Sequence, residues 1–176
     1  MHSWYVRRYT LPEVLAKELP QAKFRSATDR PYTPHMFVAI DPELEADFRD
    51  HARAAFPREA CGLLGRAPDP TVIRLVCYQR MTNLAATTDR FEMDPIAVVQ
   101  GEQQLRAAGL ELGAVFHSHP GAPPTPSTAD HAEAWPGLAQ LILSVRWNGD
   151  NSGELTAWMR RGDRLRPLHP IGRCLA

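Results

Sequence analysis

Two histidines separated by one residue stand at the end of an apolar run, and a Ser-x-x-Asp sequence follows them. His117 and His119 come directly after Leu112–Phe116. If this run is a β-strand, its alternation points both imidazoles to one face. Ser127 is expected at or near a helix N-cap, with Asp130 in the first turn. Two imidazole nitrogens and one carboxylate could then converge on a metal ion and leave a position for water, as in catalytic zinc sites.

Each part of this pattern also has a simpler interpretation. Ser-x-x-Asp is a common helix-capping sequence, so Ser127 could serve only as the N-cap. A lone His-x-His pair occurs on protein surfaces by chance. The combination is more specific, because the strand, the His-x-His pair, a Pro-rich loop and the capped Asp130 follow in the order that a metal site needs.

The whole pattern, His-x-His, seven residues, Ser, two residues, Asp, resembles that of the JAMM (MPN-plus) metalloprotease family. That family also requires a glutamate upstream, and the stretch Pro57–Gly65, with Glu59 at its third position, looks like the usual setting. The similarity covers roughly residues 36–168. It is greatest to the short prokaryotic members that act on ubiquitin-like sulfur-carrier proteins.

The resemblance implies one Zn²⁺ per chain, with His117, His119 and Asp130 as its ligands. It also implies that Glu59 is the base that activates the zinc-bound water, and that Ser127 donates a hydrogen bond to the tetrahedral oxyanion. The implied substrate is the amide bond after the C-terminal Gly-Gly of a ubiquitin-like or sulfur-carrier protein. Without the downstream motif, Glu59 would be interpreted as a solvated acid at the start of a strand. The ligand types alone leave iron or manganese open.

Strands and helices alternate along the chain, which indicates an α/β fold with a mixed sheet and helices on both faces. The resemblance implies the same architecture, a cytidine-deaminase-like α/β/α layer. Helices are predicted over 41–56, 94–108 and 127–135. Strands are predicted over 36–40, 59–65, 71–81, 112–119, 138–147, 155–161 and 164–168, with a short edge strand at 90–93.

The chain divides into an N-terminal extension, residues 1–35, and a JAMM-like domain, residues 36–176. The extension contains a predicted short helix over Leu11–Leu19. It could pack on the domain, mediate a homodimer or act as an arm that docks substrate, and the sequence does not choose among these.

Several side chains outside the motif have expected roles. Ser118 alternates away from the metal and is expected to orient a neighbouring group by a hydrogen bond. Cys61 is expected to be a small packed thiol. His51 is expected to be a satisfied, partly buried helix residue, and His131 an exposed one. On the second helix, the inward face is predicted to be Ile96, Val99 and Leu105.

Composition excludes several classes of function. Twenty basic and twenty acidic residues balance, so no overall charge attracts the chain to nucleic acid or to an acidic membrane. No apolar run approaches the length of a membrane span, and no signal peptide is visible. Three cysteines without CxxC spacing favour a reduced, cytoplasmic protein.

Other functions remain as alternatives at this point. One is a peptidase of the same type on another substrate, such as cell-wall peptide. Another is a DNA-repair-associated relative, which the balanced charge disfavours. A non-catalytic MPN-like scaffold would lack ligands, whereas every ligand position is filled here. A nucleotide deaminase would need H-x-E and P-C-x-x-C, and neither occurs.

Overall fold

The computed structural model describes residues 37–69, 72–146, 153–168 and 171–173. The predicted extension, with its helix over Leu11–Leu19, lies outside the described residues. The described helices are α2 (Pro42–Ala55), α3 (Pro95–Ala107) and α4 (Thr128–Glu133). The strands are β1 (Phe37–Ile40), β2 (Cys61–Arg66), β3 (Val72–Met81), β4 (Glu111–Pro120), β5 (Ala139–Val145), β6 (Leu155–Arg161), β7 (Arg164–Leu168) and β8 (Ile171–Arg173).

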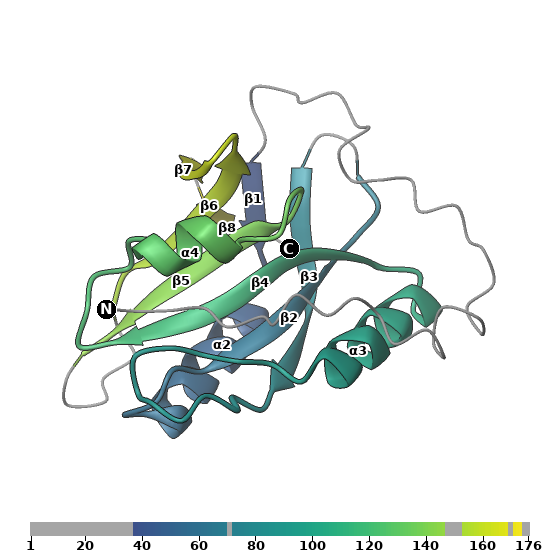
Figure 1. Ribbon diagram of the computed structural model, residues 1–176. Helices are drawn as coiled ribbons and strands as arrows, with labels where there is room; N and C mark the ends of the chain where they lie inside the picture. Colours follow the sequence, from purple (N-terminus) through teal and green to yellow (C-terminus); the bar gives the residue numbers. More distant parts are fainter. Residues whose placement is uncertain (1–36, 70–71, 147–152, 169–170, 174–176) are drawn as a thin grey trace.

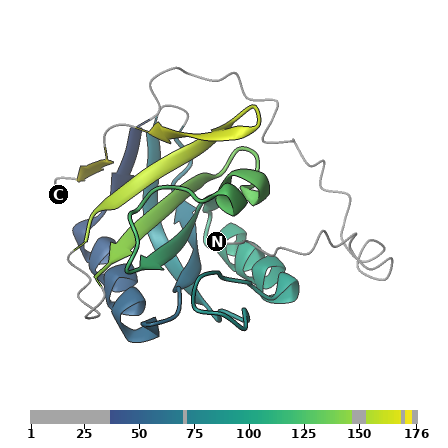
Figure 2. The same cartoon turned by 60° about the vertical axis from the view of Figure 1, so that its left-hand side comes forward.

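All of these strands belong to one mixed sheet, in the order β7-β6-β5-β4-β2-β3-β1-β8. β4 is central: it pairs antiparallel with β2 and parallel with β5. α2 lies behind the sheet in Figure 1, and α3 and α4 lie in front of it. The turned view in Figure 2 shows the same separation of the helices. The predicted α/β architecture, with a mixed sheet and helices on both faces, is confirmed.

Local sequence signals place the helices. Asp41 and Asp94 each cap a helix whose first residue is proline, and their carboxylates accept backbone N–H groups from Glu43 and Ile96, both at 2.9 Å. Proline fits there because the first turn of a helix does not use its N–H. The predicted helices and long strands agree with the structure to within two residues at each described end. None of the described helices is long and apolar enough to cross a membrane.

The core consists of two clusters, one on each face of the sheet. Behind the sheet, Phe48 of α2 packs on Phe116 and Tyr78, with ring centroids 4.8 and 5.9 Å apart. In front, Cys61, Leu63, Val115, Phe91 and Met93 form the second cluster. The site described below lies on this front face.

Three details differ from the sequence predictions. Residues 90–93 form no strand; Phe91 and Met93 are instead buried as a loop against the front face. β8, only three residues long, was not predicted and pairs with β1. Ile96 was predicted to face inward, but it is 58% exposed.

The error at Ile96 follows from how α3 approaches the sheet. The helix packs through Val98, Gly101 and Leu105, which lie three and four residues apart. Gly101 permits close approach: a Cβ there would lie 3.0 Å from Leu63 Cδ1. Ile96 is two residues from Val98, about 200° around the helix, and therefore faces solvent.

The burial of Phe48 predicts a large effect on stability. Phe48→Ala should lower the free energy of unfolding by about 3–5 kcal/mol, because it leaves a cavity beneath α2. Urea unfolding followed by circular dichroism would measure this change. Phe37→Ala is the matched control, since Phe37 is 43% exposed and should cost much less. Equal losses in the two variants would contradict the assigned core.

Candidate metal centre

β4 carries the two histidines into the interior of the protein. It lies between β2 and β5, and its register places His117 opposite Cys61 on one side and Ile142 on the other. His117 and His119 are both buried, and their Nε2 atoms are 3.0 Å apart. The prediction that the strand directs both imidazoles to one face is therefore confirmed.

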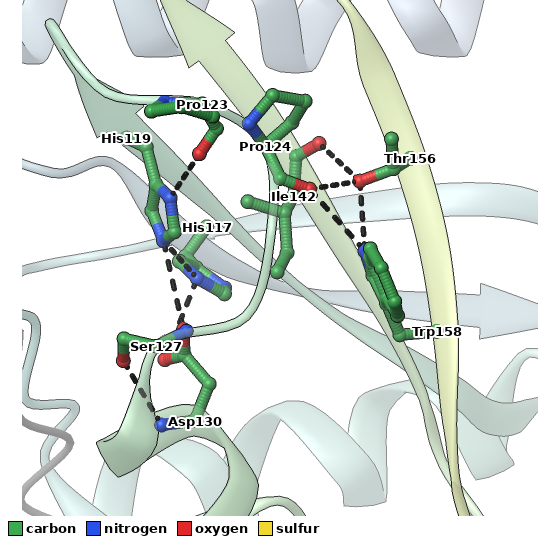
Figure 3. Close-up of polar contacts among 9 residues, drawn as sticks. All are labelled: His117, His119, Pro123, Pro124, Ser127, Asp130, Ile142, Thr156 and Trp158. Atoms are coloured by element: carbon green, nitrogen blue, oxygen red, sulfur yellow. Dashed lines mark hydrogen bonds and ion pairs between the residues drawn. The ribbon is translucent and has the colours of Figure 1, made fainter. Parts of the chain in front are cut away.

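The ring of His119 is oriented by the loop that follows β4. Its Nδ1 lies 2.8 Å from the carbonyl oxygen of Pro123. A carbonyl can only accept a hydrogen bond, so Nδ1 carries the hydrogen, and the neutral ring presents a lone pair at Nε2. Figure 3 shows this lone-pair nitrogen directed toward His117 and Asp130.

Polar side chains hold the loop itself in place. Gly121 has φ +66°, which lets the chain turn sharply at the end of β4. The carbonyl of Pro124 accepts hydrogen bonds from Thr156 Oγ1 at 2.5 Å and from Trp158 Nε1 at 3.3 Å, as Figure 3 shows. Ser144 Oγ donates to Ala122 O at 2.9 Å. β5 and β6 thus fix the backbone that orients His119.

Asp130 enters from α4, whose first turn is a capping box. Ser127 Oγ accepts the N–H of Asp130 at 3.2 Å, and the N–H of Ser127 donates to Asp130 Oδ2 at 2.6 Å. The two carboxylate oxygens lie 3.7 Å from His117 Nε2 and from His119 Nε2. Burial alone would raise the pKa of Asp130, but His117, His119 and the Ser127 N–H together hold it below its usual range.

The three side chains have the chemistry and spacing of a metal site. One donor atom from each of His117, His119 and Asp130 lies within 4.8 Å of the other two. A tetrahedral zinc with bonds of about 2.0–2.1 Å would keep its donors about 3.3 Å apart, close to the separations described above. Two imidazoles and a carboxylate buried together without a cation would be costly to desolvate. In the described ranges, no second group of this kind is found.

Glu59 lies beside this group. It precedes β2 by two residues and is buried, so the simpler interpretation of a solvated acid does not hold. Burial, with the charges of Asp130 and Asp89, raises the pKa of Glu59 well above its usual value. Its Oε1 is buried without a hydrogen-bond partner among the described residues. An acid in this state can exchange a proton with a group that enters the site.

Glu59 also borders a cleft of about 410 Å³. The cleft lies between the end of α2 and the end of β3, and Arg58, Arg80 and Asn83 line it. Of these four residues, Glu59 lines the cleft, whereas His117, His119 and Asp130 do not.

The neighbouring residues confirm two expectations and correct a third. Cys61 is a packed thiol whose pKa burial, and then the charge of Glu59, raises to about 12, so it is not a thiolate at neutral pH. His51 is satisfied by the hydroxyl of Tyr78 at 2.7 Å. His131, expected on the surface, is half-buried, and its Nδ1 accepts the N–H of Leu165 in β7 at 2.9 Å.

Two residues near the site had no sequence signal that singled them out. Phe91 packs against the ring of His117, with centroids 5.0 Å apart. Asn83 donates a hydrogen bond to the carbonyl of Glu59 at 2.8 Å. Both come from the segment between β3 and α3, which has no regular secondary structure until α3 begins.

Comparison with known proteins agrees with this geometry. Residues 41–161 match the family of prokaryotic homologs of the JAB domain. A desampylase of Haloferax volcanii is 34% identical over 135 residues, which cover 71% of this chain and 91% of that protein. The deubiquitinase MYSM1 of Homo sapiens is 33% identical over 94 residues, 53% of this chain and 11% of that protein.

Solved structures show the same fold. A protein from Desulfitobacterium hafniense superimposes with a TM-score of 0.69 at 28% identity, covering 78% of this chain and 92% of that one. A protein from Salinibacter ruber gives a TM-score of 0.58 at 32% identity, covering 77% and 91%. With the family match over most of its length, the chain belongs to the prokaryotic branch of the JAB-domain family and is a JAMM-type isopeptidase.

Proposed function

We propose that this chain is a zinc-dependent isopeptidase that cleaves the amide bond after the C-terminal Gly-Gly of a ubiquitin-like or sulfur-carrier protein. The observation that carries the proposal is the convergence of three buried donors, His117, His119 and Asp130, beside the buried acid Glu59. The substrate class is supported by the similarity to the desampylase of Haloferax volcanii.

In this proposal His117, His119 and Asp130 hold the zinc. A bound zinc would supply Lewis acidity to the scissile carbonyl and lower the pKa of a water ligand to about 7. The chain prepares the ligands for this role. Pro123 O keeps the hydrogen of His119 on Nδ1, and the Ser127 N–H keeps Asp130 oriented by its bond to Oδ2.

Glu59 is the proposed general base and acid. Its carboxylate takes a proton from the attacking water as the water oxygen bonds to the scissile carbonyl carbon. It then gives this proton to the amine nitrogen, which leaves as the C–N bond breaks. The cleft bordered by Glu59 offers space for the leaving side of the substrate, because proton delivery requires the amine to lie near this carboxylate.

Ser127 is the proposed hydrogen-bond donor to the oxyanion. Its oxygen accepts the N–H of Asp130, and a hydroxyl that accepts one bond can still donate through its hydrogen. The capping role and the catalytic role are therefore compatible. A donor aimed at the developing oxyanion is worth about 10²–10³ in kcat in other hydrolases.

The domain boundaries and the cellular location are also proposals. The domain is proposed to comprise residues 36–176, with residues 1–35 as its extension. A cytoplasmic location fits Cys61 and Cys77, which are both free thiols, as expected in a reducing compartment.

The ligand assignment predicts stoichiometric metal. The purified protein should contain one zinc per chain. Losing a residue that only orients a ligand typically weakens metal binding about 10–100-fold, so Asp130→Ala, which removes a proposed ligand, should weaken zinc binding by more than this. Competition with a chromophoric chelator would give the affinities. Asp163→Ala is the matched control, because Asp163 is exposed in the β6–β7 turn. A protein that binds no zinc would be an MPN-like scaffold instead.

The base assignment predicts a separation of binding from catalysis. Zinc-loaded Glu59→Gln should keep its metal but cleave a Gly-Gly-ended sulfur-carrier conjugate at least about 100-fold more slowly. Mass spectrometry of the products would locate the cleaved bond. Glu43→Gln, on the exposed start of α2, should behave as wild type. Full turnover by metal-loaded Glu59→Gln would remove Glu59 from the mechanism.

Chelator treatment completes this experiment. Wild-type protein stripped of metal should lose cleavage and regain it when zinc is restored. If zinc is bound at one per chain but no Gly-Gly conjugate is cleaved, the substrate proposal fails while the site stands. Other amide substrates, such as cell-wall peptides, would then be tested.

A further inference from the structure

The peptide group between Glu59 and Ala60 is held at both of its polar atoms by side chains. The carbonyl of Glu59 accepts a hydrogen bond from Asn83 Nδ2 at 2.8 Å. The N–H of Ala60 donates to Ser118 Oγ at 2.9 Å. This plane contains the Cα of Glu59, so fixing it fixes the point from which the Glu59 side chain leaves the backbone.

Asn83 is held in a single orientation by four hydrogen bonds. Besides Glu59 O, its Nδ2 donates to Arg90 O at 3.0 Å. Its Oδ1 accepts the N–H groups of Ala85 at 2.9 Å and Glu92 at 3.1 Å. A flipped amide would set an oxygen against two carbonyls. Asn83 thus ties Glu59 to the segment that follows β3, along the lower edge of the sheet in Figure 1.

Ser118 ties the same peptide to the strand of the metal ligands. It is fully buried between His117 and His119 in sequence, on the opposite face of β4. Its N–H donates to Ala60 O at 3.0 Å, as in a regular antiparallel pair. The return bond from Ala60 N goes to the Ser118 side chain. The base and the ligands therefore share one rigid connection.

We propose that Asn83 and Ser118 are positioning residues, which together fix the Glu59 carboxylate relative to His117 and His119. The inference rests on the proposed function, in which Glu59 is the base. The carboxylate is the distal end of a flexible side chain, so a small rotation of the peptide plane displaces it by a larger amount. A misplacement of about 1 Å can cost about 10²-fold in rate.

The test uses Asn83→Asp and Ser118→Ala. The first change is isosteric and keeps an acceptor for Ala85 and Glu92, but it replaces the donor to Glu59 by an oxygen. Each variant should lower kcat by about 10–100-fold with zinc content unchanged. KM should stay unchanged in Ser118→Ala, because Ser118 does not line the cleft proposed for substrate, whereas Asn83 does. Gln79→Glu is the matched amide-to-acid control, since Gln79 of β3 bonds to Gln104 instead and should keep its kcat.

Two further variants separate positioning from general damage. Ser118→Thr retains the hydroxyl and should restore most of kcat. The double variant Asn83→Asp/Ser118→Ala should have about the same kcat as the less active of the two single variants, because both residues act on one peptide group. Lower unfolding free energy with unchanged kcat would show a merely structural role and overturn the proposal.

Amide hydrogen exchange at Ala60, followed by NMR, gives a readout that needs no substrate. Asn83→Asp should raise its exchange rate at least about tenfold by loosening the plane, and Gln79→Glu should not. An unchanged exchange rate at Ala60 would overturn the proposal. If wild-type protein cleaves no conjugate, the proposed function fails separately, and the exchange rates then decide whether the peptide is held as inferred.

Discussion

The register between β2 and β4 is the constraint on which the site depends. Cys61 lies opposite His117, and this pairing brings the residues just before β2 alongside the end of β4. A shift by one residue would turn both histidines toward the face covered by α2 and take Glu59 out of reach. The hydrophobic alternation of β4, with Ala114 and Phe116 behind and Val115 in front, prevents that shift.

The site is also held by what surrounds the donor atoms. Buried charges are tolerated only when they are paired or bind a cation, and all three donor residues are buried. The oriented Nδ1–H of His119 and the capping box at Asp130 would fix these donors before the proposed metal binds. Such preorganisation reduces the cost of ordering the ligands when the ion binds.

The sequence predicts the parts of the site that are encoded locally. Alternation in β4 places His117 and His119 on one face, and Ser127 and Asp130 follow the pattern of a helix start. Cys61, His51 and Ser118 also behave as predicted. The alternation of β4 and the capping box depend on residues within a few positions of one another, where strand and capping rules apply.

What the sequence does not predict depends on tertiary contacts. The inward face of α3 is set by the close approach of Gly101 to Leu63, so the predicted position of Ile96 is wrong. His131 is covered by β7, whose Leu165 is 34 residues away along the chain. Phe91 and Asn83 lie in a loop without periodicity, and nothing in their neighbourhood marks them as part of a site.

The alternation of β4 assigns two tasks to three consecutive residues. The outer two face the proposed metal position, and Ser118 between them faces the Ala60 N–H, 58 residues earlier in the chain. Any rotation of the strand would therefore move the ligands and the support of Glu59 together. Because one strand carries both, the sheet ties the proposed base Glu59 to the proposed metal ligands, while Asn83 ties it to the loop after β3. That arrangement suits a reaction whose rate depends on a separation of a few tenths of an ångström.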